Sequence, residues 1–157
     1  MYWEAVISVG RRVKEIMFTI TVTPRFGDVD VLGHINNTAP ALWFEQARNP
    51  FFRFFSPDLS ITHETWNLIM AHTDYDFVDE LFFRYDVEIR SAVSRIGTKS
   101  FTIHHEAWQN GMLCVKGNAV LVYYDFINRQ SIPIPEEKKK LLAEHYHEEH
   151  NTQTSKT

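Results

Sequence analysis

Polar side chains that can perform acid–base or nucleophilic chemistry lie close together between residues 28 and 37. A carboxylate there can attack a carbonyl or activate a water, and an imidazole titrates near neutral pH. Asparagine side chains can position a carbonyl or a water molecule. The same residue types also form Asx turns and helix caps, so a loop-shaping role is the competing interpretation. The residues concerned are Asp28, Asp30, His34, Asn36 and Asn37.

The elements on either side place this segment between a strand and a helix. Residues 18–23 are rich in β-branched side chains and alternate as a half-buried strand does. After Asn37 the apolar residues recur at helical spacing. Asp30 is therefore expected in a strand-to-helix connection, near the unpaired amides and the positive dipole end of the helix. Such amides can stabilise an oxyanion that forms beside the carboxylate.

This segment also carries a family resemblance, because its spacing resembles the D-x-D-x-x-G-H-x-N-N signature of hotdog-fold acyl-CoA thioesterases, the group similar to 4-hydroxybenzoyl-CoA thioesterase. The string Trp43-Phe44-Glu45-Gln46-Ala47-Arg48 resembles the continuation of that signature. Residues 95–101 and 132–135 resemble later parts of the family, so the resemblance covers residues 17–142. Pro40 stands where many members carry a tyrosine, a difference that bears on the shape of the acyl pocket.

The resemblance implies a thioester hydrolase in which Asp30 is the nucleophile or the general base. Gly33 would permit the turn and the close approach of the acyl group, and His34 is an alternative base. Asn37 would position the carbonyl or a water, or would instead cap the helix. Glu45 is a second catalytic candidate, because other hotdog enzymes use a helix glutamate, although a solvated side chain is the simpler interpretation. The remaining expected substrate contacts in this loop are Asp28 and Asn36.

Coenzyme A carries phosphates, which need a few basic groups near the site rather than a basic protein. Lys99 and Ser100 match a segment that contacts the nucleotide in the resembled enzyme, and Arg95 lies close by in the sequence. Solvated cations at a strand end are the alternative interpretation. The acyl group is expected to lie against aromatic residues such as Trp43. The resemblance implies no cofactor, since the coenzyme A thioester is the substrate.

The implied fold class is α+β, a hotdog fold in which a curved antiparallel β-sheet wraps around a long central α-helix. Helical spacing predicts that helix over residues 38–55, with Asn37 or Thr38 as its N-cap and a kink at Pro50. A last helix is predicted from Pro135 to about His147. Strands are predicted over residues 68–78, 83–94, 99–108 and 112–126, with tight turns at 96–97 and 110–111.

Composition excludes several other classes of protein. The 157 residues suit one domain over residues 17–150, with an N-terminal extension over 1–16 and a polar tail over 151–157. The formal net charge of -4 argues against nucleic-acid binding, and no apolar run approaches the ~18 residues of a membrane span. Cys114 is the single cysteine, which favours a cytoplasmic protein without a disulfide. No metal site is expected, because the adjacent His104 and His105 should point to opposite faces of a strand.

Edge strands predict an oligomer. Pairing two exposed edges into one continuous sheet satisfies their main-chain groups, so we expect a homodimer or a dimer of dimers with the active site at the interface. The alternatives among enzymes are a thioesterase that acts on acyl carrier protein and an enoyl-thioester hydratase, and the alternative from another class is a non-catalytic dimer that binds acyl-CoA.

Overall fold

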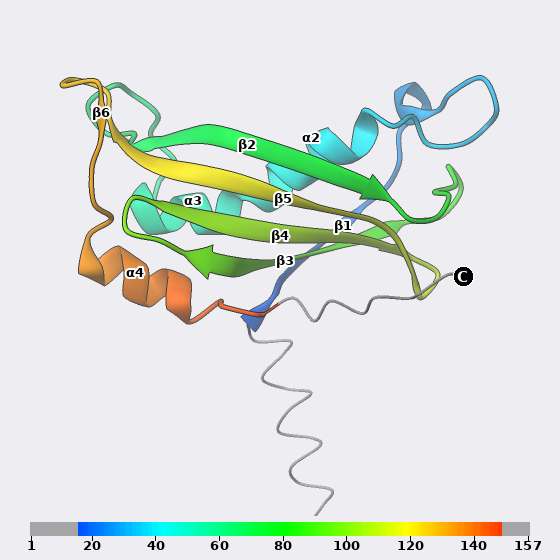
Figure 1. Ribbon diagram of the computed structural model, residues 1–157. Coiled ribbons are helices and arrows are strands. Elements are labelled where there is room, and N and C mark those ends of the chain that lie inside the picture. Colours follow the sequence, from blue (N-terminus) through cyan, green and yellow to red (C-terminus); the bar gives the residue numbers. More distant parts are fainter. Residues whose placement is uncertain (1–15, 149–157) are drawn as a thin grey trace, which may run out of the picture.

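A curved antiparallel sheet of six strands, with helices against its concave face, makes up the described part of the chain, residues 16–148 of a computed structural model (Figure 1). The order across the sheet is β1-β3-β4-β5-β2, and β6 pairs with β5. The strands are β1 (Phe18–Val22), β2 (Leu68–Phe77), β3 (Val87–Ile96), β4 (Ser100–Gln109), β5 (Met112–Asp125) and β6 (Gln130–Ser131). The expected hotdog arrangement is confirmed, since the sheet curves around the helical segment that follows β1.

The helical segment is divided into α2 (Ala39–Ala47) and α3 (Asn49–Phe55), so the prediction of one long helix over residues 38–55 is wrong in its continuity. The break falls at Arg48, whose amide donates to the carbonyls of Glu45 and Gln46. Pro50 explains the break, because proline has no N–H to donate to the carbonyl four residues earlier. The expected kink therefore takes the form of two consecutive helices.

The predicted N-cap position of α2 is confirmed at Thr38, but the side-chain hydrogen bonds there come from Asn36. Thr38 occupies the N-cap position but its side chain makes no capping bond. The Asn36 side-chain oxygen instead accepts hydrogen bonds from the amide and the hydroxyl of Thr38, both at 3.0 Å. The amide of Ala39 donates to the Asn36 carbonyl at 3.0 Å. This Asx turn fixes how the connection enters the helix.

Two other boundaries differ from the sequence prediction by more than two residues. β3 begins at Val87 rather than residue 83, because the chain at 82–85 bends around the buried amide of Gln109. The last helix, α4 (Glu136–Ala143), ends before residue 147, because His145 and His147 form main-chain hydrogen bonds with Val93 of β3 instead. The predicted turn at 110–111 is confirmed, with both residues in the left-handed region. The polar tail and residues 1–15 of the N-terminal extension lie outside the described residues.

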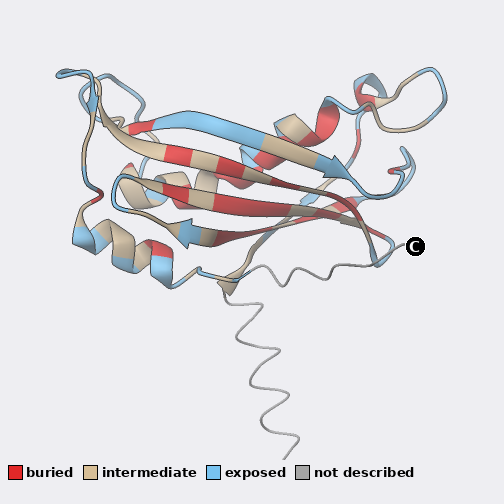
Figure 2. Cartoon of the chain, viewed as in Figure 1, coloured by how far each residue is buried: buried red, intermediate tan, exposed pale blue. Residues whose placement is uncertain are grey.

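Burial is unequal across the sheet (Figure 2). The central strands β3, β4 and β5 carry most of the buried positions, whereas β2 is exposed along most of its length. β2 and β1 are the two edges of the sheet, and β2 is the longer at ten residues against five. β2 is therefore a long and accessible edge.

Candidate active site

A tight turn between Asp30 and His34 presents the Asp30 carboxylate. One carboxylate oxygen, Oδ1, accepts hydrogen bonds from the amides of Leu32 at 2.8 Å and His34 at 3.1 Å. The Asp30 amide in turn donates to the His34 carbonyl at 2.8 Å. Gly33 has a φ of +80°, a value that side-chain-bearing residues rarely adopt. The loop-shaping role and the chemical role of Asp30 thus coexist, because Oδ2 makes no hydrogen bond to a described residue.

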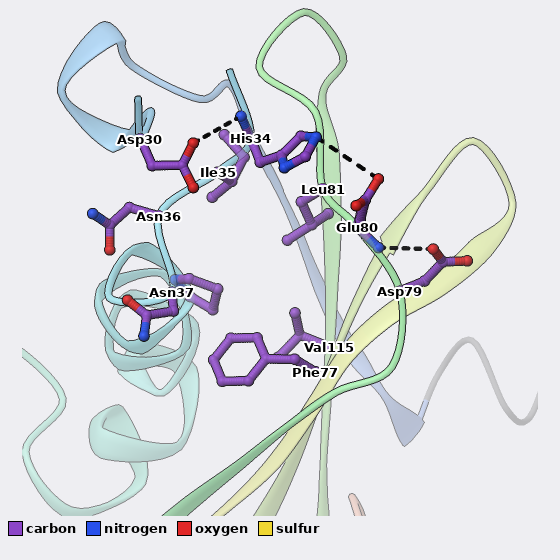
Figure 3. A pocket seen from close by; sticks show the side chains of 11 residues that line it. Asp30, His34, Ile35, Asn36, Asn37, Phe77, Asp79, Glu80, Leu81 and Val115 are labelled. Atoms are coloured by element: carbon purple, nitrogen blue, oxygen red, sulfur yellow. Dashed lines mark hydrogen bonds and ion pairs between the residues drawn. The ribbon is translucent and has the colours of Figure 1, made fainter. Parts of the chain in front are cut away.

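A pocket of about 440 Å³ lies between this loop, the start of α2 and the connection that follows β2 (Figure 3). Asp30, Asn36 and Asn37 are on one side, and Asp79 and Glu80 are on the other. The other lining residues are largely apolar: Ile35, Pro40, Phe77, Leu81 and Val115, with His34 at the rim. A polar rim over an apolar base suits a substrate with a reactive polar group and an apolar body.

Main-chain donors at the start of α2 are partly occupied. The amides of Thr38 and Ala39 are bonded to Asn36, and Pro40 has no N–H. Asn37 lines the same wall, and its amide and side chain hydrogen-bond to no described residue. Of the residues at this helix start that line the pocket, Asn37 is the one whose N–H groups have no described acceptor.

The opposite wall places a carboxylate beside the imidazole of His34. The distance between His34 Nε2 and Glu80 Oε2 is 3.8 Å, with both side chains partly in solvent. The ring of Phe82 meets the His34 ring edge to face at a centroid distance of 5.8 Å. The amide of Glu80 donates to Asp79 Oδ1 at 2.7 Å. His34 is therefore positioned by residues that follow β2.

The structure brings together four of the residues that the sequence singled out, namely Asp30, His34, Asn36 and Asn37. Asp28 lies apart from the pocket lining and is buried, with Oδ2 accepting from the Arg25 amide at 2.8 Å. Burial acts to raise the pKa of Asp28, but the hydrogen bonds and the charge of Arg25 hold it below its ordinary value. Asp28 thus holds the short helical turn η1 (Phe26–Asp28).

Two predicted residues of α2 are also outside the pocket lining. Trp43 is buried in the core and Glu45 is exposed to solvent. Asp79, Glu80 and Phe77 line the pocket but were missed, because their position depends on long-range pairing. Pairing of β2 with β5 and a hydrogen bond from the Ile35 amide to the Leu81 carbonyl bring that segment to the loop. The one local signal was that Phe77 lies near the end of the predicted strand 68–78 and that Asp79 and Glu80 follow it directly.

The residues expected to contact coenzyme A lie in the same chain but at the opposite end of the sheet from the Asp30 pocket. Ser100 pairs with Val122 of β5, whereas the pocket residue on β5 is Val115. Seven residues of strand separate these positions, or about 23 Å. Arg95 and Lys99 lie at the same far end, beside the turn between β3 and β4. One chain alone therefore does not bring these basic residues to the Asp30 pocket.

Two further structural findings concern metal binding and membrane insertion. Among residues 16–148, no group of three histidine, cysteine, aspartate or glutamate side chains is placed to hold a metal ion. None of the described helices has the length and apolar character needed to cross a membrane. The arrangement suits hydrolytic chemistry by a carboxylate, an amide donor and a histidine around a pocket.

Comparisons with known proteins agree with this geometry. The model of the thioesterase-like superfamily matches residues 24–142. An uncharacterized Bacillus subtilis protein, YsmA, is 25% identical over 122 residues, which are 77% of this chain and 82% of YsmA.

Two solved structures share both fold and sequence with the chain. One is a predicted thioesterase from Bacillus stearothermophilus, with 37% identity, a TM-score of 0.81, and coverage of 85% of this chain and 99% of the other. The second is a thioesterase from Thermus thermophilus complexed with coenzyme A and Zn, with 27% identity, a TM-score of 0.70, and coverage of 81% and 92%.

Proposed function

The chain belongs to the thioesterase-like superfamily, and we propose that it hydrolyses acyl-CoA thioesters in the pocket beside Asp30. The observation that carries this proposal is the Asp30 carboxylate, which is oriented by two amides and keeps Oδ2 available at the rim of an apolar pocket. A coenzyme A complex in the Thermus thermophilus relative supports the choice of thiol. The products are a carboxylic acid and free coenzyme A.

Asp30 starts the reaction in either of two ways. As a general base, its Oδ2 takes a proton from a water, the hydroxide adds to the thioester carbonyl, and the tetrahedral intermediate expels the thiolate. The carboxyl proton of Asp30 then passes to the thiolate, which restores the carboxylate. As a nucleophile, Oδ2 itself adds to the carbonyl and expels the thiolate, and water then hydrolyses the resulting anhydride.

Asn37 is proposed to polarise the carbonyl. Asn37 lines the pocket at the start of α2, its N–H groups have no described acceptor, and the helix dipole there favours developing negative charge. His34 lies across the rim, with Glu80 beside its Nε2 atom. In this position His34 orients the thioester or a water rather than replacing Asp30, whose carboxylate the main chain already orients.

The active form is proposed to be a dimer that pairs two copies of β2. This edge strand is ten residues long and exposes apolar side chains, including Ile69, Met70 and Phe77. Antiparallel pairing across a twofold axis places the Leu68 end of one β2 beside the Phe77 end of the other. Since Ser100 and Leu68 belong to the same end of the sheet, the partner's β3–β4 turn would then approach the pocket.

Release of coenzyme A from short-chain, long-chain and aromatic acyl-CoAs tests the proposed function. Asp30→Asn should lower kcat by about 10²- to 10⁴-fold, because it removes the base or the nucleophile. Glu64→Gln, which changes an exposed carboxylate far from the pocket, is the matched control and should leave kcat unchanged. Full activity of Asp30→Asn would contradict the role of Asp30, and failure to hydrolyse every acyl-CoA would contradict the proposed activity.

A single turnover in ¹⁸O-labelled water tests whether Asp30 is the nucleophile. If Asp30 is the nucleophile, the label enters its carboxylate when water attacks the anhydride at the aspartyl carbon, and otherwise enters the released acid. If Asp30 is a general base, the label enters the released acid alone. Mass spectrometry of the peptide that contains Asp30 identifies a nucleophile when it detects either ¹⁸O in that carboxylate or, after rapid quenching, the acyl group on it.

A further inference from the structure

A layer of polar side chains divides the buried core of the protein into two apolar clusters. One cluster lies around α2 and includes Ile89 and Ala107, and the other lies around α3 and includes Val93 and Ile103. On β3, Ser91 stands between Ile89 and Val93, and on β4, His105 stands between Ile103 and Ala107. Arg48 occupies the corresponding position between α2 and α3. Arg48, Ser91 and His105 are all buried.

Hydrogen-bonding groups in this layer are unsatisfied. Nε and Nη1 of Arg48 and Nε2 of His105 are buried and bond to no described residue. The relative exposure is 5% for Arg48 and 1% for His105. On the other side of the His105 ring, Nδ1 and the Ser91 hydroxyl form a hydrogen bond of 2.6 Å. When Ser91 donates this bond, Nε2 carries the ring proton and is a donor like the guanidinium.

Electrostatics show that these groups act on each other. Burial, the charge of Arg48 and that of His104 lower the pKa of His105 well below its ordinary value, so its ring is neutral. Burial also lowers the pKa of Arg48, while the nearby Tyr75 and Glu45 act in the opposite direction. Arginine remains charged even so. A buried cation without a bonded acceptor is costly, whereas a carboxylate that accepts two of its N–H groups offsets that cost.

The polar layer lies beyond the base of the active-site pocket. Pro40 lines the pocket, and Phe44 and Arg48 follow it at intervals of four residues along one face of the helical segment. The Phe44 ring stacks between Tyr75 and His105, at centroid distances of 5.8 and 5.0 Å. Phe44 therefore lies between the pocket residue Pro40 and Arg48 on this face of the helical segment.

Between the pocket and Arg48, the inward positions of β5 carry small residues. Gly117 of β5 pairs with both Tyr75 and His105, and a side chain at 117 would collide with the Asp74 carbonyl and touch the Phe44 ring. The next inward position after Gly117 on β5 is Ala119. The Phe44 ring is held here by stacking contacts and makes no hydrogen bond, so its displacement by an acyl chain would cost packing contacts only.

From these observations we propose that Arg48 and His105 form an anion subsite at the far end of the acyl site, which takes the distal carboxylate of a ω-carboxyacyl-CoA. The inference rests on the proposed thioesterase function and names its substrate class. Arg48 donates Nε–H and Nη1–H to the carboxylate oxygens, and His105 donates Nε2–H. The thioester at the other end of the acyl chain reaches Asp30, so the subsite selects both charge and chain length.

Matched pairs of substrates test this subsite: ω-carboxyacyl-CoAs against unsubstituted acyl-CoAs of the same carbon number. The wild type should show a higher kcat/KM for the ω-carboxyacyl member at one chain length. Arg48→Met keeps a long apolar stem and should lower that ratio about 10- to 100-fold while the unsubstituted acyl-CoA is still hydrolysed. Arg53→Met is the matched control, because Arg53 is an exposed cation on α3, and it should leave the ratio unchanged.

Binding of thioether analogues, which cannot be hydrolysed, gives a readout that is independent of turnover. Calorimetry should show tighter binding of S-(ω-carboxyalkyl)-CoA than of S-alkyl-CoA to the wild type, and Arg48→Met should remove that difference. An unchanged ratio in Arg48→Met, or an equal loss for both substrates of a pair, would overturn the subsite. Hydrolysis of unsubstituted acyl-CoAs with no preference for a carboxylate would overturn it as well, while leaving the proposed function in place.

Discussion

The two aspartates of the loop after β1 have different tasks. Asp30 keeps one oxygen available at the pocket, whereas Asp28 is buried and accepts hydrogen bonds from the amide and the guanidinium of Arg25. Asp28 therefore stabilises the folded loop in its charged form. Its pKa, which Arg25 holds below the ordinary value despite burial, makes this contribution dependent on pH.

Asp28→Asn tests that task. At pH 7 the variant should lose about 1 to 3 kcal/mol of unfolding free energy, since it loses charge-assisted hydrogen bonds. Because the folded-state pKa is lowered, the unfolded state binds more protons in acid, and the contribution of Asp28 is lost as the pH falls below the ordinary aspartate value of about 4. Urea unfolding at several pH values should show the two proteins converging in acid. A difference that stays constant with pH would contradict the charged role of Asp28.

The elements around the site differ in how far the sequence predicts them. The strand, the turn at Gly33 and the helix start are local features, so the positions of Asp30 and Asn37 in a strand-to-helix connection followed from the residues themselves. The wall formed by Asp79 and Glu80 did not, because it depends on a strand 40 residues later pairing with β5. Similarly, the helical spacing predicted burial around residue 48 but not that a cation would be buried there.

Gln109, at the end of β4, hydrogen-bonds to the segment that directly follows the pocket wall formed by Asp79 and Glu80. Its side-chain oxygen accepts from the Phe82 amide at 2.8 Å, and its side-chain nitrogen donates to the carbonyls of Phe82 at 2.8 Å and Tyr85 at 3.0 Å. Phe82 forms a β-bridge with His34, whose amide holds Asp30. Gln109 is thus a positioning residue that acts on Asp30 through two main-chain links.

Gln109→Leu should leave the part-buried main-chain groups at 82 and 85 without their partner, costing about 1 to 3 kcal/mol of stability and lowering kcat. Gln109→Glu provides a sharper test. Its neutral carboxyl can donate to one of these carbonyls, whereas its carboxylate cannot donate and faces two carbonyl oxygens. Burial favours the neutral form, so kcat relative to wild type should rise as the pH is lowered. A ratio that does not change with pH would mean that Gln109 has no positioning role.

For the whole molecule, the charge of the pocket argues for a contribution from a second subunit. Asp30, Asp79 and Glu80 line the pocket, and its lining includes no lysine or arginine. The phosphates of coenzyme A need cations, and the chain's own Lys99 lies at the other end of the sheet. Antiparallel pairing of two β2 strands would bring Lys99 of one subunit to the Asp30 of the other.

A heterodimer with one defect in each subunit tests this arrangement. Asp30→Asn and Lys99→Glu subunits with different tags are coexpressed, and the mixed dimer is purified with both tags. If Lys99 serves the opposite subunit, one of the two sites has both wild-type residues and the other has neither, so kcat/KM per dimer should be about half the wild-type value.

If Lys99 serves its own subunit, each site has one defect. The mixed dimer would then show no more than half the activity of the Lys99→Glu homodimer, because its other site lacks Asp30. A low value for the mixed dimer would therefore place the phosphate contacts within one chain and remove the main electrostatic reason for pairing through β2.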